Sequence, residues 1–191
     1  MKKKRRNNLE NLYTYNSRKD EYEISLSLRN YEEIYNPYDF SQYKRRDMDE
    51  DFLDYIYHSS LDIPLGHKIK LKFNLKENVY DEEKSKNLKN AIKNNYTWRH
   101  AIINNRLKEK LKEAILLLIV GTIFLSLAFL ILPLIQNGGT ILDLFGESVS
   151  IIGWVFLWDL VELLAFEVTK LHKKKKYLNR LINSKVEFEQ Y

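Results

Sequence analysis

The chain has 191 residues, a formal net charge of +5 at pH 7 and no cysteine, and 45% of its residues are hydrophobic. Such a length allows one ordinary domain, or a smaller domain with a membrane anchor, and is too short for a multidomain machine. The lack of cysteine excludes disulfides, thiol nucleophiles and cysteine-ligated zinc or iron–sulfur centres.

The N-terminal segment is strongly basic. Residues 1–6 read MKKKRR, and polar residues rather than an apolar core follow them, unlike in a secretory signal peptide. We predict that residues 1–20 form a basic disordered tail. Two interpretations of its charge stay open: a solvated tail, or contact with anionic lipid headgroups, to which each basic residue near the surface contributes about 1 kcal/mol.

Two segments alternate between apolar and polar residues. In residues 22–28 and 69–75 every second residue is apolar, and lysines fill most of the polar positions of the second segment. This period of two is typical of strands with one buried face. We therefore predict a small sheet in the N-terminal region.

An aromatic segment follows the first predicted strand. Residues 30–46 combine turn-forming residues with four tyrosines and one phenylalanine. Rigid amphipathic side chains of this kind are enriched at interfaces, so one interpretation is a partner-binding loop. The other is a loop that packs its aromatic residues onto its own sheet. The candidate residues are Tyr31, Tyr35, Tyr38, Phe40 and Tyr43.

Two helices are predicted in the rest of this region. Asp47 and Glu50 have capping-box spacing in front of an apolar pattern at residues 52–57, which predicts a short amphipathic helix. From Asp81 onward apolar residues recur about every four positions, which predicts a long amphipathic helix that runs into the first apolar stretch. Asn104 marks a place where this helix could break.

Two long apolar stretches predict a transmembrane hairpin. Residues 114–135 contain no charge over 22 positions, and about 20 apolar residues suffice to cross the hydrocarbon core as a helix. Residues 149–168 carry three carboxylates, but a short connector places them where a returning helix is expected. The connector, residues 136–148, is predicted to be an external loop.

The flanking charges set the predicted orientation. The connector contains no lysine or arginine, whereas five basic residues lie at positions 99–112 and six at positions 170–180. By the positive-inside rule, both flanking regions and both termini are cytoplasmic. We therefore predict a multi-pass protein of the inner or plasma membrane, in contact with a lipid bilayer that has anionic headgroups.

Asp159 and Glu162 are the strongest chemical candidates, because an acidic group inside a bilayer is costly. Three positions apart, they share a helix face, and Thr122 and Ser126 lie at matching depths on the first apolar stretch. One interpretation is hydrogen bonding between helices, in the hairpin or in an oligomer, worth about 1 kcal/mol per bond. The other is a proton- or cation-responsive pair. We favour the first.

Further residues of the spans are candidates for packing. Lys112 and Glu167 are predicted to lie level at the inner interface and to form an ion pair. Gly153, Trp154 and Trp158 are candidates for contact between the spans or with a second copy. Tryptophan prefers the membrane interface, whereas Trp158 falls near the predicted centre, which favours a packing role.

The C-terminal region, residues 169–191, is predicted to return to the sheet. Its segment LHKKKKYLNRL places apolar residues on one side of a cationic helix, as in a helix that lies on a membrane surface. Residues 185–189 then alternate like a short edge strand. Beside the second predicted strand it would form cross-strand ion pairs, each worth roughly 0.2–1 kcal/mol. These pairs join Glu187 and Glu189 to Lys70 and Lys72.

The sequence carries no familiar catalytic or cofactor-binding pattern. Its six glycines form neither a P-loop nor a dinucleotide fingerprint, and its four histidines lack metal-ligand spacing. We therefore predict no cofactor, no metal and no enzymatic activity. The lysine-rich strand resembles a nucleic-acid surface in composition only, and nucleic acid is not an expected partner.

The second apolar stretch also carries a resemblance. Gly153-Trp154-Val155, then Trp158 and Glu162, followed by the basic segment LHKKKKYLNRL, resemble the second span of an uncharacterised family of small prokaryotic two-span membrane proteins. Weaker similarity reaches the Tyr-rich loop with Asp51-Phe52-Leu53 and the strand KIKLKFNL. In that family Arg-Pro follows the second tryptophan, where this chain has Asp159-Leu160, which leaves Glu162 the better candidate. The resemblance implies no known activity.

These predictions combine into one architecture and two functional hypotheses. The expected fold class is α+β: a cytoplasmic domain with a sheet of two or three strands at residues 21–113, a two-helix transmembrane hairpin, and a C-terminal helix and strand that return to the sheet. The first hypothesis is a non-enzymatic membrane-anchored module for sensing, binding or scaffolding, with a protein, a small ligand or a second copy as partner. The alternative is an oligomeric channel or membrane-disrupting effector gated by the cytoplasmic domain.

Overall fold

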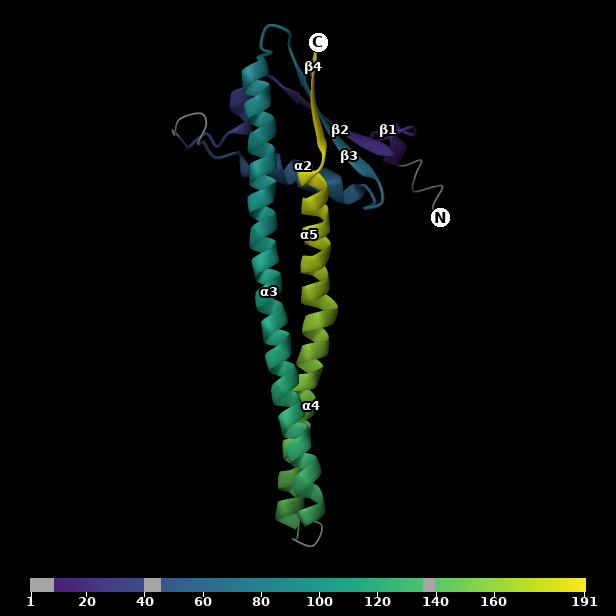
Figure 1. Ribbon diagram of the computed structural model, residues 1–191, viewed down its shortest axis with the longest axis vertical. Helices are drawn as coiled ribbons and strands as arrows, with labels where there is room; N and C mark the ends of the chain where they lie inside the picture. Colours follow the sequence, from purple (N-terminus) through teal and green to yellow (C-terminus); the bar gives the residue numbers. More distant parts are fainter. Residues whose placement is uncertain (1–8, 40–45, 136–139) are drawn as a thin grey trace. The chain divides into compact units, whose positions relative to one another are not determined.

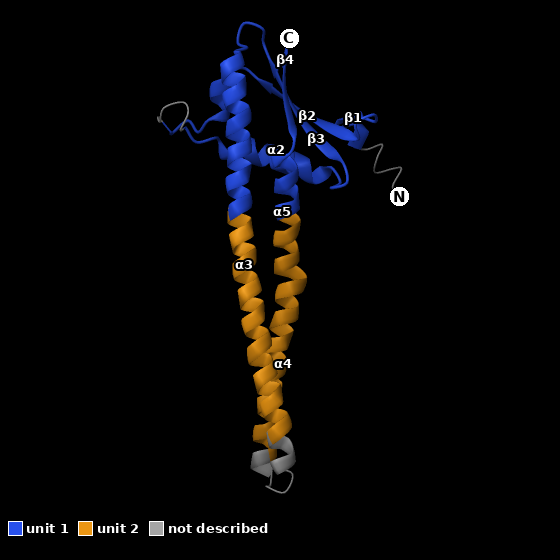
Figure 2. Cartoon of the chain, in the orientation of Figure 1, with its two compact units in different colours: residues 1–101, 175–191 blue, residues 102–174 orange. Residues whose placement is uncertain are grey.

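The fold is α+β in a computed structural model that describes residues 9–39, 46–135 and 140–191, with only the backbone of residues 131–135 and 140–142 (Figure 1). The contacts divide the chain into two compact units (Figure 2). The first comprises residues 1–101 and 175–191 and contains the sheet, and the second comprises residues 102–174.

A four-stranded mixed sheet forms the centre of the first unit. Its strands are β1 (Thr14–Asn16), β2 (Glu21–Leu28), β3 (Lys68–Leu75) and β4 (Lys185–Gln190), in the order β1-β2-β3-β4. β1 pairs antiparallel with β2, and the other two strand pairs are parallel. The amino ends of β2, β3 and β4 therefore meet at one edge of the sheet.

The three predicted strands are confirmed, and β1 is additional. In β2 and β3 the apolar residues of the alternation are buried, as expected for a sheet with one covered face. The prediction of a disordered tail over residues 1–20 is wrong at β1 and at Leu9, which is 8% exposed. The turn after β1 places Asp20 at φ 51°, a left-handed conformation that aspartate adopts more readily than most residues.

The helices differ strongly in length. They are η1 (Tyr31–Ile34), α2 (Glu50–Asp62), α3 (Glu82–Ile135), α4 (Thr140–Glu162), η2 (Leu163–Val168) and α5 (Thr169–Ile182). The long predicted helix is confirmed, and it continues through Asn104 without a break. α3 and α5 each contribute residues to both units.

The apolar face of the sheet is covered by α2 and by the first turns of α3. The ring of Phe52 in α2 lies 6.1 Å from that of Phe73 in β3. The Tyr96 hydroxyl in α3 donates to the carbonyl oxygen of Leu53 in α2 at 2.9 Å, and both residues are buried. These contacts join the two helices and the sheet around one core.

The N-terminal cap of α2 differs from the prediction. The carboxylate of Asp49, rather than that of Asp47, accepts a hydrogen bond from the backbone N–H of Phe52 at 2.8 Å. A cap residue bonds to the N–H groups two or three positions further on. Asp47 and Asp49 both lie a few residues before the apolar pattern, so the sequence alone does not separate them. The helix begins one residue after Asp49, which makes Asp49 the cap.

α5 packs on the first unit and does not expose its apolar side. Tyr177, Leu178 and Leu181 are buried. The prediction of a helix that lies on a membrane surface is therefore wrong for this part of α5, because protein side chains already cover these residues. The chain then enters β4, which pairs with β3 over six residues as the alternation predicts.

The second unit consists of helical segments. α4 begins at Thr140, so the predicted external loop at residues 136–148 is helical from Thr140 onward, and residues 136–139 lie outside the described chain. Between α4 and α5 the six residues of η2 form a π-helix. The hydroxyl of Thr169, the first residue of α5, donates to the carbonyl oxygen of Leu164 in η2 at 3.0 Å. Such segments interrupt the regular α-helical periodicity.

Candidate functional site

Two helical stretches are long and apolar enough to cross a membrane by length and composition. They fall within Glu82–Leu130 and Asp143–Ile182, and only 17% of the most apolar window of each is buried. A core helix of a soluble protein is mostly buried. The apolar side chains that this chain leaves exposed include Leu116, Ile123, Phe129, Ile151, Val155 and Phe166.

The two apolar helices approach each other closely at glycine. A Cβ placed on Gly153 would lie 2.9 Å from the backbone nitrogen of Leu125, so no larger residue fits without a shift. The rings of Phe124 and Phe156 stack next to this point at 5.9 Å. By contrast, Trp154 and Trp158 are 64% and 72% exposed and do not fill the space between the helices.

The carboxylates in the second apolar stretch are exposed rather than paired with hydroxyls. The Thr122 hydroxyl donates to the carbonyl oxygen of Leu118 in its own helix at 2.7 Å. Within the described part of the chain, neither Asp159 nor Glu162 bonds to Thr122 or Ser126. The prediction of hydrogen bonds between these helices is therefore wrong within one chain. A threonine hydroxyl in a helix has a nearer acceptor in the backbone carbonyl one turn earlier.

Glu167 forms an ion pair, but with a different lysine from the one predicted. Its carboxylate lies 2.9 Å from the amine of Lys110. Lys110 lies on the same stripe of α3 as the buried residues Leu107 and Ala114. Lys112 is two positions further on, which is about 200° around the helix. The prediction named the wrong lysine because it compared only the depths of Lys112 and Glu167 along the helices and not their positions around the helix.

The Tyr-rich segment is mostly internal where it is described. Tyr31 and Tyr35 are 3% and 4% exposed, and the Tyr31 hydroxyl lies 2.6 Å from that of Ser85 in α3. Tyr38 is 87% exposed, and Phe40 and Tyr43 lie outside the described residues. The partner-binding interpretation is therefore wrong for Tyr31 and Tyr35, because the first unit buries them itself.

The polar face of the sheet carries the predicted ladder of ion pairs. The Lys70 amine lies 2.6 Å from Glu187 in β4 and 3.0 Å from Glu23 in β2, and Lys72 pairs with Glu189. Hydrogen bonds from Lys185 and Lys70 lower the pKa of the Glu187 carboxyl to about 2. This arrangement confirms that the end of the chain is bound to the sheet by charge as well as by backbone pairing.

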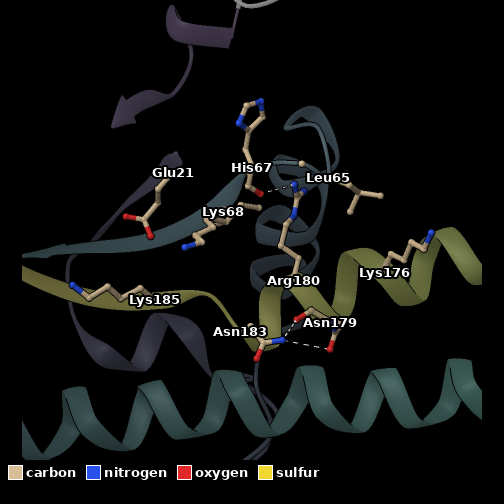
Figure 3. A pocket seen from close by; sticks show the side chains of 11 residues that line it. Glu21, Leu65, His67, Lys68, Lys176, Asn179, Arg180, Asn183 and Lys185 are labelled. Carbon is tan, nitrogen blue, oxygen red and sulfur yellow. Dashed lines mark hydrogen bonds between the residues drawn. The ribbon is translucent and has the colours of Figure 1, made fainter. Parts of the chain in front are cut away.

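A pocket of about 460 Å³ opens at the amino ends of the parallel strands (Figure 3). The loop between α2 and β3, the strand ends and α5 line it. We call it the basic pocket, because four cationic side chains and one carboxylate line it. They are Lys68, Lys176, Arg180, Lys185 and Glu21.

Arg180 holds the wall of the basic pocket in place. Its guanidinium donates to the carbonyl oxygens of Pro64 at 2.7 Å, of Ile63 at 3.0 Å and of His67 at 3.4 Å, and also to that of Ser60. Burial lowers the pKa of Arg180, but an arginine remains charged at neutral pH. Because all these acceptors are carbonyl groups, the positive charge of the guanidinium is not neutralised by them.

His67, which also lines the basic pocket, bonds to Asp20, the residue immediately before β2. The Nδ1 atom of His67 lies 2.6 Å from the Asp20 carboxylate, and the Tyr15 hydroxyl donates to the same oxygen at 2.8 Å. The hydrogen bond with His67, followed by that with Tyr15, lowers the pKa of the Asp20 carboxyl. The Asp20 carboxylate is thus held in its charged form by His67 and Tyr15.

Sequence reasoning did not find the basic pocket. The lysine-rich strand and the basic helix were recognised only as separate features, and the helix was predicted to lie on a membrane surface. Their meeting depends on the parallel pairing of β4 with β3, which brings the end of α5 to the amino ends of the strands. Pro64 and Gly66 were the local signal for a loop at this place.

Comparisons of the chain with protein-family models, with curated proteins and with solved structures give no match.

Proposed function

We propose that this chain is an integral membrane protein whose two apolar stretches cross the inner or plasma membrane as a hairpin. Both termini and the first unit, which contains the sheet and is called the α+β unit below, lie on the cytoplasmic side. There this unit acts as a membrane-anchored binding module. The observation that carries the proposal is the exposure of apolar side chains along both stretches. Only 17% of the most apolar window of each stretch is buried. Lipid is the environment in which such a surface is stable.

The distribution of charge supports the orientation. The residues between the two apolar stretches include no lysine or arginine, whereas basic residues precede the first stretch and follow the second. Positive charge near the ends of spanning helices is retained on the cytoplasmic side. Lys110, which pairs with Glu167, belongs to this basic set.

Cysteine accessibility tests the topology cleanly, because the natural chain has no cysteine. We expect a membrane-impermeant maleimide to label Asp143→Cys in intact spheroplasts of the expression host. Asn78→Cys, placed in an exposed loop of the α+β unit, should be labelled only after lysis. Labelling of Asn78→Cys in intact spheroplasts, or release of the protein by alkaline carbonate, would contradict the proposal.

A second candidate function is an oligomeric channel or membrane-disrupting effector. The observation that favours it is the exposure of the Asp159 and Glu162 side chains on an apolar helix. Ionisable groups within a span mark ion pathways when several copies enclose them. Ion flux from liposomes tests this function: Glu162→Gln and Asp159→Asn should each reduce the flux, with Asp143→Asn as the matched control. No flux, or equal flux in all variants, would exclude the channel.

A further inference from the structure

We propose that the basic pocket binds a phosphate monoester, carried either by a lipid headgroup or by a soluble molecule. This inference names a ligand class for the α+β unit, which the proposed function leaves open. The pocket belongs entirely to the first unit and is lined by the strand ends, the α2–β3 loop and α5.

The charge of the pocket suits an anion. Lys185 already forms an ion pair with Glu187, a carboxylate that it shares with Lys70. Of the remaining cations, Lys176 forms no ion pair among the described residues, and Lys68 interacts electrostatically with Asp20. Arg180 donates to carbonyl oxygens and lies over the Tyr177 ring at 5.1 Å, so no carboxylate is bonded to it. The pocket keeps an excess of positive charge, because Lys68, Lys176 and Arg180 are opposed only by Glu21 in the lining and by Asp20 beside Lys68. A phosphate monoester carries about −1.5 to −2 at pH 7.

The donors suit an oxyanion that enters from solvent. The side chains of Lys68 and Lys176 are exposed, so their amines are free to turn toward a ligand. Each ammonium supplies three hydrogen-bond donors. Arg180 acts behind them as a positioning residue: it holds the loop at Pro64 and adds a fixed positive charge, while its Nη donors stay with the carbonyl groups. In Figure 3 Lys68 lies on the strand, Arg180 reaches from α5 toward the loop at His67, and Lys176 lies further along α5.

The size of the pocket allows more than inorganic phosphate. Small-molecule sites commonly measure about 300–1,000 Å³, and the basic pocket, at about 460 Å³, also has room for part of the esterified group. At Gly66 a Cβ atom would meet nothing within 4 Å, so the rim on this side is open. Lys176 follows the second apolar stretch by only eight residues, which makes a lipid headgroup a realistic source under the proposed topology.

The first arm of the test uses a soluble probe and does not depend on the membrane topology. The full chain is purified in neutral detergent, and its melting temperature is followed while glycerol phosphate is added. We expect saturable stabilisation of the natural chain. The double variant Lys68→Gln/Lys176→Gln should bind at least about tenfold more weakly, because charge-assisted hydrogen bonds are lost. The control Lys89→Gln/Lys93→Gln removes the same charge from exposed positions of α3 outside the pocket and should bind like the natural chain.

The second arm identifies the source and rests on the proposed function. The protein is placed in nanodiscs of phosphatidylcholine, with or without phosphatidic acid, whose headgroup is a phosphate monoester. If lipid is the source, phosphatidic acid raises the melting temperature and abolishes the response to glycerol phosphate. If the source is soluble, the response is the same in both nanodiscs. Both outcomes support the phosphate site.

Two results would overturn the inference. One is the absence of any saturable response to glycerol phosphate in detergent and to phosphatidic acid in nanodiscs. The other is an equal loss in the pocket variant and in the control variant, which would show that the response follows net charge rather than the pocket. Failure of cysteine labelling to give the proposed topology would leave the detergent result unaffected, so the two proposals fail separately.

Discussion

Gly121 and Gly153 face each other across the two apolar helices: a Cβ on Gly121 would lie 3.2 Å from the carbonyl oxygen of Gly153. Small residues allow helix backbones to approach closely, which is how apolar helices associate in lipid. The two sites are not equivalent. A methyl group on Gly121 would mainly meet the flexible side chain of Leu157, whereas one on Gly153 would meet the backbone of Leu125.

Gly153→Ala should therefore destabilise the helix pair more than Gly121→Ala. We expect a cost of about 1–3 kcal/mol for Gly153→Ala, as for other overpacked sites, and less for Gly121→Ala because a side chain gives way more easily than backbone. Val155→Ile adds the same methyl group at an exposed position and should cost less than about 0.5 kcal/mol. Unfolding of the protein in mixed micelles measures the order. Equal effects of Gly153→Ala and Val155→Ile would contradict the observed close approach.

Arg180 should be required for the stability of the α+β unit even without a ligand. Arg180→Lys replaces a planar fork that reaches four carbonyl oxygens with a single ammonium group, and these acceptors lose their donors. We expect a loss of about 2 kcal/mol in the free energy of unfolding. Arg29→Lys is the matched control, because the Arg29 side chain is 93% exposed. A melting temperature of Arg180→Lys within 1 °C of the natural chain, about the spread of a surface substitution, would contradict this role.

The ion pairs of β4 should make stability depend on acidity. The pKa of Glu187 falls from its ordinary value of 4.5 to about 2. A carboxyl group with a lowered pKa in the folded state contributes stability above its unfolded pKa, and this contribution is lost as pH falls through the folded pKa. The difference in melting temperature between the natural chain and Glu187→Gln should therefore be largest above about pH 5 and shrink toward pH 2.

A matched variant separates this effect from general acid denaturation. Glu77→Gln removes an exposed carboxylate that lies outside the ion-pair ladder, so it should change the melting temperature little and equally at all pH values. If the difference between the natural chain and Glu187→Gln were the same at pH 6 and pH 2, the charge of Glu187 would not contribute to the pairing of β4.

The success of the sequence predictions follows the range of the interactions involved. The strands at Tyr22 and Ile69 could be predicted because alternation is a local consequence of one buried face. The partners of Glu187 and Glu189 could be predicted because opposite charges fall on the same face of adjacent strands. β1 was missed because its three residues, from Thr14, are too few to show a period.

Features that depend on azimuth or on long-range assembly could not be predicted. Lys110 rather than Lys112 reaches Glu167 because position around the helix, and not depth alone, decides which side chains meet. The π-helical segment from Leu163 leaves no residue pattern in the sequence. The basic pocket requires the end of α5 near Arg180 to meet the amino ends of strands far away in the sequence, which only the parallel topology brings about.

Asp159 and Glu162 provide the sharpest test of what surrounds the second apolar stretch. If lipid alone faces them, replacing either with leucine should favour membrane insertion of the helix, by up to about 3 kcal/mol for an acid near the centre of the bilayer. Asp159 lies nearer the middle of the stretch, so Asp159→Leu should have the larger effect. Asp143→Leu, near the start of α4, should have little effect. A glycosylation-based insertion assay measures these differences.

If Asp159→Leu instead lowers the stability of the protein in its native membrane, the carboxylate faces protein or water, and the assembly of several copies becomes the better account of the exposed acids.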